Sequence, residues 1–190
     1  MDFVNSDDIK FKIPFAAIIS GSSNTGKTQL LIRLLKNADF MFSPRANDIL
    51  YCYGQYGSHI VELQNMGVKV HSGVPPDWLL ERLAKPFVLI LDDLIDSLDQ
   101  KTLSSYYTRR SHHENFGIFV VTQNLFSKNL MVARNNSTYV LLSRSPNALL
   151  QIRNFGVQIF PGKTQLQYFL DAYKEATSIP YGNCLFILIY

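Results

Sequence analysis

The chain has 190 residues, a formal net charge of +3 and an apolar content of 47%. This length accommodates one compact α/β domain, residues 1–190, and would be crowded for two. The modest charge does not itself indicate a nucleic-acid-binding protein, although it excludes an acidic disordered chain. The acidic N-terminus lacks the features of a signal peptide, and no apolar run approaches a membrane span of about 20 residues. We therefore expect a soluble, intracellular protein with no evident need for a membrane.

Apolar runs of strand length alternate with segments of helical periodicity along the chain. The expected strands are residues 15–19, 49–53, 87–91, 118–121, 139–142 and 185–190. The expected helices are residues 28–36, 59–65, 78–83, 100–111, 125–133, 146–154 and 164–176. The strand runs are apolar on both faces, as parallel strands between two helical layers must be. The pattern predicts a three-layer α/β fold with a mainly parallel central sheet.

Residues 21–28 read GSSNTGKT and fill every fixed position of the phosphate-binding loop G-x-x-x-x-G-K-[ST]. The glycines let backbone N–H groups surround phosphates, Lys27 reaches the outer two phosphates, and the Thr28 hydroxyl ligates Mg²⁺. A chance turn before a core helix is the alternative, but a strand precedes the loop and a helix follows it, as the motif requires. The expected nucleotide contacts are Gly21, Ser22, Ser23, Asn24, Thr25, Gly26, Lys27, Thr28 and Gln29.

Two carboxylates follow a second apolar strand, in the sequence 88–93 VLILDD. After a phosphate-binding loop, this pattern predicts that Asp92 holds Mg²⁺ through water and that Asp93 polarises the attacking water. Glu is more common than Asp in the second role, so the metal role of Asp92 is the firmer of the two. A helix N-cap or a loop is the alternative for an isolated Asp-Asp pair.

A third buried run, 118–121, ends in the amides of Gln123 and Asn124. P-loop ATPases that carry an extra strand between the loop strand and the acidic strand place a polar residue here, where it contacts the γ-phosphate and its water. Gln123 is the first candidate for this catalytic role and Asn124 the second. Without that context, a strand-end amide is equally often a turn residue.

Together these motifs resemble the packaging ATPases of the FtsK/HerA superfamily, in particular those of Polinton-like elements, adintoviruses and poxvirus-type large DNA viruses. The resemblance covers nearly the whole chain and rests on residues 14–15, 91–94, 111–115, 122–126, 134–142, 172–177 and 181–182. It implies a RecA-like P-loop NTPase of the additional-strand type that uses ATP and Mg²⁺. It also implies a homo-oligomeric ring that moves double-stranded DNA into a preformed capsid and docks on a capsid or portal-vertex protein. The expected location is the host nucleus or a cytoplasmic virus factory, with association to the virion.

Such a ring commonly completes each site with an arginine from the neighbouring subunit. The resemblance makes Arg134 the first candidate, followed by Arg144 and the pair Arg109-Arg110, whereas a solvated or carboxylate-paired arginine is an equally good interpretation of any of them. The DNA contacts should be mainly to phosphates, because a translocase must accept any sequence. Plausible contacts are Lys101, Arg109, Arg110 and Lys128.

Related packaging ATPases continue after Tyr181-Gly182 with a strand that carries an Asp, whereas residues 183–190 hold no acid before the sequence ends. Two explanations stay open: a truncated chain, or a copy that drifts within an element integrated in a host genome. Two other functions stay open: a conjugation or segregation pump of the same superfamily, and a nucleotide-binding structural subunit without turnover. A nucleotide kinase is a weaker alternative, because the segment after Leu94 shows neither an arginine-rich lid nor an acceptor pocket.

Overall fold

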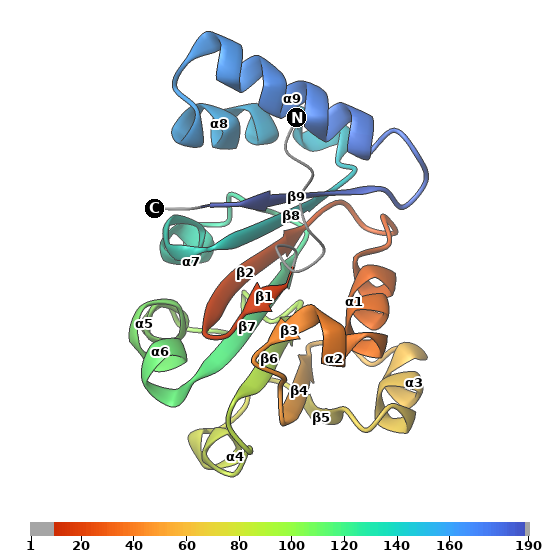
Figure 1. Ribbon diagram of the computed structural model, residues 1–190, viewed down its shortest axis with the longest axis vertical. Helices are drawn as coiled ribbons and strands as arrows, with labels where there is room; N and C mark the ends of the chain where they lie inside the picture. Colours follow the sequence, from red (N-terminus) through yellow and green to blue (C-terminus); the bar gives the residue numbers. More distant parts are fainter. Residues whose placement is uncertain (1–9, 189–190) are drawn as a thin grey trace.

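A seven-stranded sheet runs through the computed structural model, which describes residues 10–188 (Figure 1). Its strand order is β5-β4-β6-β7-β2-β8-β9. The strands are β2 (Phe15–Ser20), β4 (Asp48–Tyr53), β5 (Lys69–Ser72), β6 (Phe87–Asp92), β7 (Phe116–Thr122), β8 (Tyr139–Ser143) and β9 (Asn183–Ile187). All neighbouring pairs are parallel except β8 and β9. The prediction of an α/β fold with a mainly parallel sheet is confirmed.

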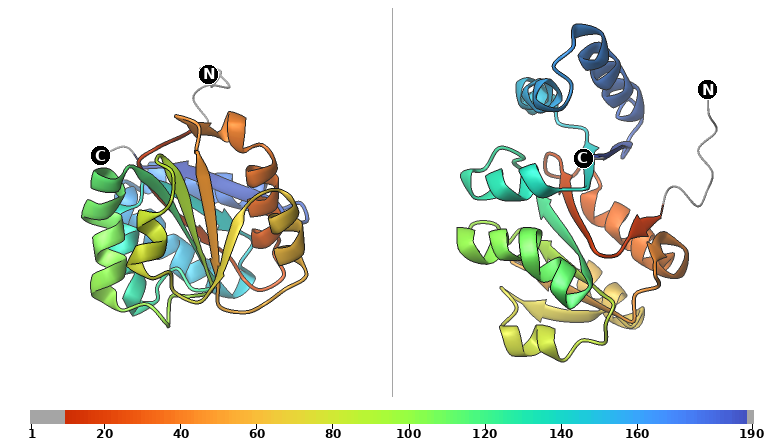
Figure 2. Two further views of the ribbon diagram at one scale, coloured as in Figure 1. Left: turned by 90° about the horizontal axis from the view of Figure 1, so that it is seen from below. Right: turned by 60° about the vertical axis from the view of Figure 1, so that its left-hand side comes forward.

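Helices cover both faces of this sheet, so the fold has three layers (Figures 1 and 2). One face carries α1 (Lys27–Lys36) and α3 (His59–Asn65). The other face carries α4 (Asp77–Glu81), α5 (Gln100–Ser105), α6 (Ser111–Glu114) and α7 (Met131–Asn136). Beyond the β8–β9 end lie α8 (Leu149–Ile159) and α9 (Lys163–Ala176), whereas the short α2 (Ala38–Met41) follows α1. A π-helical turn (Tyr106–Arg110) joins α5 to α6.

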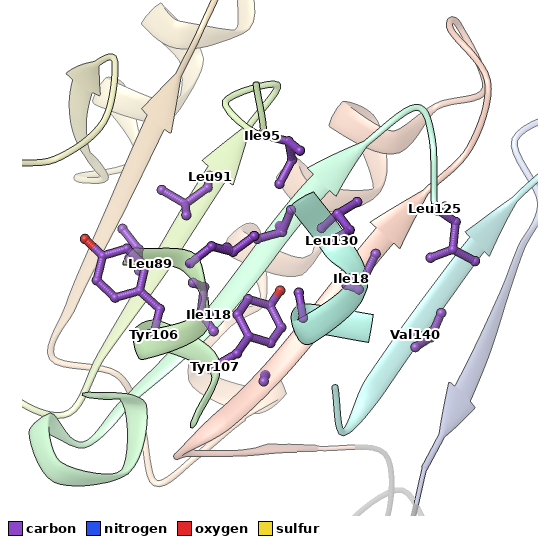
Figure 3. Close-up of a cluster of buried hydrophobic side chains, with 14 of the residues drawn as sticks. Ile18, Leu89, Leu91, Ile95, Tyr106, Tyr107, Ile118, Leu125, Leu130 and Val140 are labelled. Atoms are coloured by element: carbon purple, nitrogen blue, oxygen red, sulfur yellow. The ribbon is translucent and has the colours of Figure 1, made fainter. Parts of the chain in front are cut away.

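Side chains of the central strands alternate between two apolar clusters, as strand geometry requires. Ile18 and Leu89 face the α5–α7 layer, whereas Ile19 and Ile90 face the α1–α3 layer. Figure 3 shows the first cluster, in which the π-helical turn supplies Tyr106 and Tyr107. Strands β2 and β7 are buried along their whole lengths. The sheet is therefore a rigid base for the loops at its carboxyl edge.

Strand β9 corrects the expectation that every apolar run is a parallel strand. Ser143, the last residue of β8, pairs with Asn183, the first residue of β9, and the two strands are antiparallel. The chain leaves the sheet at its carboxyl edge, passes through α8 and α9, and returns to the same edge. A strand that starts there must run in the opposite direction. Of the expected strand 185–190, residues 189–190 lie outside the described part of the chain.

Several short elements differ from the sequence expectation. The edge strand β5 was missed because its residues, KVHS, form no apolar run. The strands β1 (Phe11–Lys12) and β3 (Phe42–Ser43), which form a separate two-stranded sheet, are too short for a periodic signal. The expected helix 125–133 begins only at a 3₁₀ turn (Lys128–Leu130), because the Asn124 side chain accepts the Phe126 N–H at 2.9 Å and closes a turn.

The expected helix 146–154 is a 3₁₀ turn (Pro146–Ala148) followed by α8, which continues to Ile159. The expected helix 100–111 is three consecutive helical segments that extend to Glu114. Among residues 10–188, no helix combines the length and the apolar character that crossing a bilayer requires.

Candidate nucleotide-binding site

Residues 21–26 connect β2 to α1 at the carboxyl edge of the sheet, and the motif ends with Lys27 and Thr28 in the first turn of α1. Gly26 has φ +89°, a backbone conformation that favours glycine, and it immediately precedes Lys27, the first residue of α1. The Thr25 hydroxyl donates to the Ser22 carbonyl at 2.8 Å, and the Ser22 N–H donates to the Ser145 hydroxyl at 3.0 Å. These contacts hold the loop curled over the N-terminus of α1, where the helix dipole favours an anion.

Lys27 lies inside this curl. Its Nζ donates to the carbonyl oxygens of Gly21 at 2.8 Å and Ser22 at 2.7 Å. Burial lowers the pKa of Lys27 from its ordinary value, and the negative charges of Asp92 and Asp93 oppose that shift. The ammonium group is therefore held by two neutral acceptors and faces two carboxylates, an arrangement that a phosphate group could enter.

The two predicted acids stand at the end of β6. Asp92 is its last residue, and burial raises the pKa of its carboxyl. Asp93 has φ +55°, and its N–H donates to the Val121 carbonyl at 3.3 Å. The left-handed conformation turns the chain sharply, so the two consecutive side chains both line the same cavity.

Asp92 has a partner that the sequence did not reveal. The Tyr51 hydroxyl donates a hydrogen bond to the Asp92 carboxylate and lies 3.3 Å from His59 Nε2. This hydrogen bond favours the charged carboxylate and opposes the effect of burial on the Asp92 pKa. Burial and the neighbouring Asp92 charge raise the pKa of Tyr51, which stays a hydrogen-bond donor. Tyr51, which also contacts His59, thus fixes the orientation of the Asp92 carboxylate.

Gln123 reaches the loop from the adjacent strand. Strand β7 lies between β6 and β2, as predicted for the additional-strand type. Gln123 follows β7, and its side-chain carbonyl accepts a hydrogen bond from the Ser23 hydroxyl at 2.8 Å. Asn124, the second candidate, uses its side chain to cap the following turn and does not line the cavity. Gln123 is thus the amide that faces the loop.

These groups surround one cavity of about 240 Å³, which we call the phosphate cavity. It is lined by Ser23, Asn24, Lys27, Thr28, Gln55, Asp92, Asp93, Val121, Thr122 and Gln123. The donor set fits Mg·ATP: one cation and a helix N-terminus suit phosphates, and the Thr28 hydroxyl with the Asp92 carboxylate gives the hard oxygen ligands that Mg²⁺ takes alongside water and phosphate. Of the remaining predicted contacts, Gly21, Ser22, Thr25, Gly26 and Gln29 lie outside this lining.

Gln55 is a lining residue that sequence reasoning missed. It lies two residues after the end of β4, at the carboxyl edge of the sheet where the other site residues also lie. A Cβ added at Gly54 would lie 2.6 Å from the Asp93 carbonyl oxygen, so only glycine lets the two loops approach this closely. The polar residue after an apolar strand was the available signal.

Arg134 does not reach the phosphate cavity of its own chain. One guanidinium nitrogen donates to the Leu125 carbonyl at 2.8 Å, and the group lies 4.5 Å from the centre of the Phe126 ring. Its Nε is buried and, among the described residues, has no hydrogen-bond partner. Burial lowers the pKa of Arg134. The predicted role in trans stays a prediction, as does that of the exposed Arg144.

Arg110, another candidate, is committed to an ion-pair network, with Glu114 and Asp77 each at 2.6 Å. This pairing favours the structural interpretation of Arg110 over contact with DNA. Arg109 and Lys101 line a separate open cavity beside α5, and their DNA contacts stay predictions.

Neither family models nor curated protein sequences match the chain. Solved structures do match. The DNA-packaging ATPase B204 of Sulfolobus turreted icosahedral virus aligns with a TM-score of 0.58 at 16% identity, over 91% of this chain and 92% of that chain. The chain therefore shares the fold of this protein.

Two further structures extend the likeness. The genome packaging NTPase B204 of Sulfolobus turreted icosahedral virus 2, in complex with AMPPCP, aligns with a TM-score of 0.55 at 14% identity, over 91% and 92% of the two chains. The cytoplasmic domain of the Thermomonospora curvata type VII secretion ATPase EccC aligns with a TM-score of 0.57 at 12% identity, over 96% of this chain and 26% of that chain. At these identities the comparison shows the fold, and on that level the predicted resemblance is confirmed.

Proposed function

We propose that this chain is an ATP-hydrolysing motor that translocates double-stranded DNA into a capsid. One observation carries the proposal: one cavity is lined by Lys27 and Thr28 from the start of α1, by Asp92 and Asp93 at the end of β6, and by Gln123 after β7. The likeness to B204, a DNA-packaging ATPase, supports packaging as the use of this site. We infer one P-loop domain that takes ATP and Mg²⁺.

Each residue in the cavity has a distinct role in this proposal. Lys27 would exchange the Gly21 and Ser22 carbonyls for the outer phosphates, at the N-terminus of α1. Thr28 and Asp92 would hold Mg²⁺, which supplies neutralising charge to the phosphates when bound. Tyr51 positions the Asp92 carboxylate for that task.

Asp93 and Gln123 would act on the attacking water. The Asp93 carboxylate accepts a proton from the water, and Gln123 orients the water beside the loop. The Ser23–Gln123 hydrogen bond already holds this amide against the loop. Both groups stand at the side of the loop that faces β6 and β7, so that side is the γ-phosphate end of the cavity.

The composition of the lining also supports a ring. Within residues 10–188, Lys27 is the one cationic side chain that lines the phosphate cavity, and it faces two carboxylates. A neighbouring subunit that supplies an arginine would stabilise the charge of the transition state. We infer a homo-oligomeric ring around double-stranded DNA, docked on a capsid or portal-vertex protein within the infected cell.

The test is ATP hydrolysis by the purified chain in the presence and absence of duplex DNA of mixed sequence. A motor hydrolyses ATP and is stimulated by the duplex, with a stimulation that weakens as salt rises because the contacts are to phosphates. A rate of ATP hydrolysis that duplex DNA does not change contradicts the assignment as a translocase. Binding without any turnover would instead support the structural subunit.

A further inference from the structure

The order of the strands determines on which side of the phosphate-binding loop the nucleoside of a bound nucleotide lies. Asp92, Asp93 and Gln123 follow β6 and β7, which lie on one side of β2 and its loop. Strands β8 and β9 lie on the other side. Because the γ-phosphate end of the cavity is at β6 and β7, the nucleoside must leave the loop toward β8 and β9. The residues at the carboxyl edge of that side are therefore candidates for contact with the base.

Tyr181 stands at this place. It lies in the turn that leads into β9, and its ring packs on the loop where α1 begins: a Cβ added at Gly26 would lie 2.8 Å from its Cδ1 and 3.2 Å from its Cβ. Yet the side chain is 65% exposed. An aromatic ring that touches the phosphate-binding loop and leaves most of its surface open offers a face for a planar ligand.

The chain holds Tyr181 in position. Its φ of +61° is unusual for a bulky residue, so neighbouring contacts must maintain it. The Asn183 side-chain amide donates to the Tyr181 carbonyl at 2.8 Å, and its oxygen accepts from the Ser143 hydroxyl at 2.5 Å. A Cβ added at Gly182 would lie 2.1 Å from the Ala176 carbonyl oxygen. The backbone of Tyr181 is thus tied to the end of β8 through Asn183, which places the ring beside the phosphate-binding loop.

We propose that Tyr181 is the platform on which the base of the bound nucleotide stacks. The inference deepens the proposed function and rests on it, because it takes the phosphate cavity as the triphosphate site. Stacking of a base on an aromatic ring contributes to the affinity for the nucleotide. Removal of the ring abolishes this contribution and leaves the triphosphate contacts intact. The base contact and the phosphate contact can therefore be measured separately.

The experiment compares two probes by calorimetric titration with Mg²⁺ present: AMPPCP, which has a base, and inorganic tripolyphosphate, which has none. The main variant is Tyr181→Asn, because Asn accepts the left-handed backbone and keeps the turn while it removes the ring. Its affinity for AMPPCP should fall about 5- to 100-fold, with the affinity for tripolyphosphate unchanged. Tyr181→Phe keeps the ring and should bind both probes like the unaltered chain.

A matched control separates the site from a general effect of losing a surface aromatic. Tyr168 on α9 is 72% exposed, and Tyr168→Ala should alter neither affinity. Unchanged AMPPCP affinity in Tyr181→Asn overturns the platform, and so does an equal loss for both probes, which means that Tyr181 only shapes the loop. If the unaltered chain binds neither probe, the phosphate site itself is wrong and the inference is overturned with it.

Discussion

Two cavities of this molecule differ in size and in chemistry, and the smaller one is the better site. The phosphate cavity measures about 240 Å³ and gathers a lysine, two carboxylates, hydroxyls and amides. A second cavity of about 570 Å³, which we call the arginine cavity, lies between α7, α8 and the end of β9. Its lining is Arg134, Asn135, Phe155, Gln158, Ile159, Phe160, Ile187 and Leu188. Convergent charge, rather than volume, marks the phosphate cavity as the better site.

The difference follows from where each cavity lies. The phosphate cavity opens at the carboxyl ends of parallel strands, where several loops meet and strand ends supply polar side chains. The arginine cavity lies between packed elements, whose facing side chains are mainly apolar. Its cation is turned toward a carbonyl and an aromatic ring and meets no acid among the lining residues of the described chain. Ligand chemistry belongs in the first cavity.

The largest expected effect is that of Lys27→Ala. It removes the cation of the phosphate cavity, so ATP turnover should be abolished and nucleotide binding greatly weakened. Hydrolysis and AMPPCP titration measure this. Lys36→Ala at the other end of α1, where the lysine pairs with Glu62 at 2.8 Å, is the matched control and should retain activity. Unchanged hydrolysis by Lys27→Ala would remove the basis for preferring the phosphate cavity.

Arg134→Ala tests whether the arginine cavity contributes to catalysis in a neighbouring subunit. If Arg134 acts across a subunit boundary, nucleotide binding persists while turnover falls roughly 10³-fold. Mixing this variant with Lys27→Ala should restore partial activity, because some interfaces then pair an intact loop with an intact arginine.

If mixed rings form and stay inactive, Arg134 acts within its own chain, through the Leu125 carbonyl and the Phe126 ring. A lowered melting temperature of Arg134→Ala would accompany that result. Arg144, an exposed residue after β8, is then the next to be replaced.

Asp93→Asn addresses the division of labour inside the phosphate cavity. The variant should bind Mg·ATP but hydrolyse it at least ~100-fold more slowly, because a positioned base is lost. Asp92→Asn should in addition raise the Mg²⁺ concentration needed for half-maximal activity. Asp96→Asn, an exposed acid three residues further on, is the control. Normal hydrolysis by Asp93→Asn means that another group takes the proton.

Much of this site could be predicted because each of its segments carries a recognisable local sequence pattern. The loop motif lies between a strand and a helix, and Asp92 and Gln123 each follow an apolar run, so local pattern alone marks them. The parallel core was equally readable from its runs, whereas the polar edge strand β5 and the reversal of β9 were not. Edge strands need no apolar run, and strand direction depends on where a connection returns.

Contacts between side chains of neighbouring strands could not be predicted from the sequence. Tyr51 lies in an apolar run and reads as a core residue, and it is fully buried. It becomes the partner of Asp92 only because β4 lies beside β6 with Tyr51 opposite Ile90, which puts Tyr51 on the same face as Asp92 two residues on. Neither the neighbour nor the register can be read from one strand. Tyr181 was likewise visible as a motif residue, but its contact with Gly26 was not.

Tyr51→Phe gives the smallest expected effect and tests the contact that the sequence concealed. The substitution keeps the buried ring and removes the hydroxyl that orients the Asp92 carboxylate. Because partners of a metal ligand tune its affinity, the Mg²⁺ concentration for half-maximal hydrolysis should rise about 10-fold, with turnover at saturating Mg²⁺ nearly unchanged.

Tyr107→Phe is the matched control, since its buried hydroxyl also donates one hydrogen bond, to the Ala17 carbonyl at 2.8 Å, and Tyr107 belongs to the apolar cluster on the opposite face of the sheet from Tyr51. Both variants should lose a similar ~1 kcal/mol of unfolding free energy, measured by urea denaturation. Only Tyr51→Phe should shift the Mg²⁺ titration. Identical Mg²⁺ curves for the two variants would show that Tyr51 contributes to the core alone, and that Asp92 is oriented by the turn at Asp93.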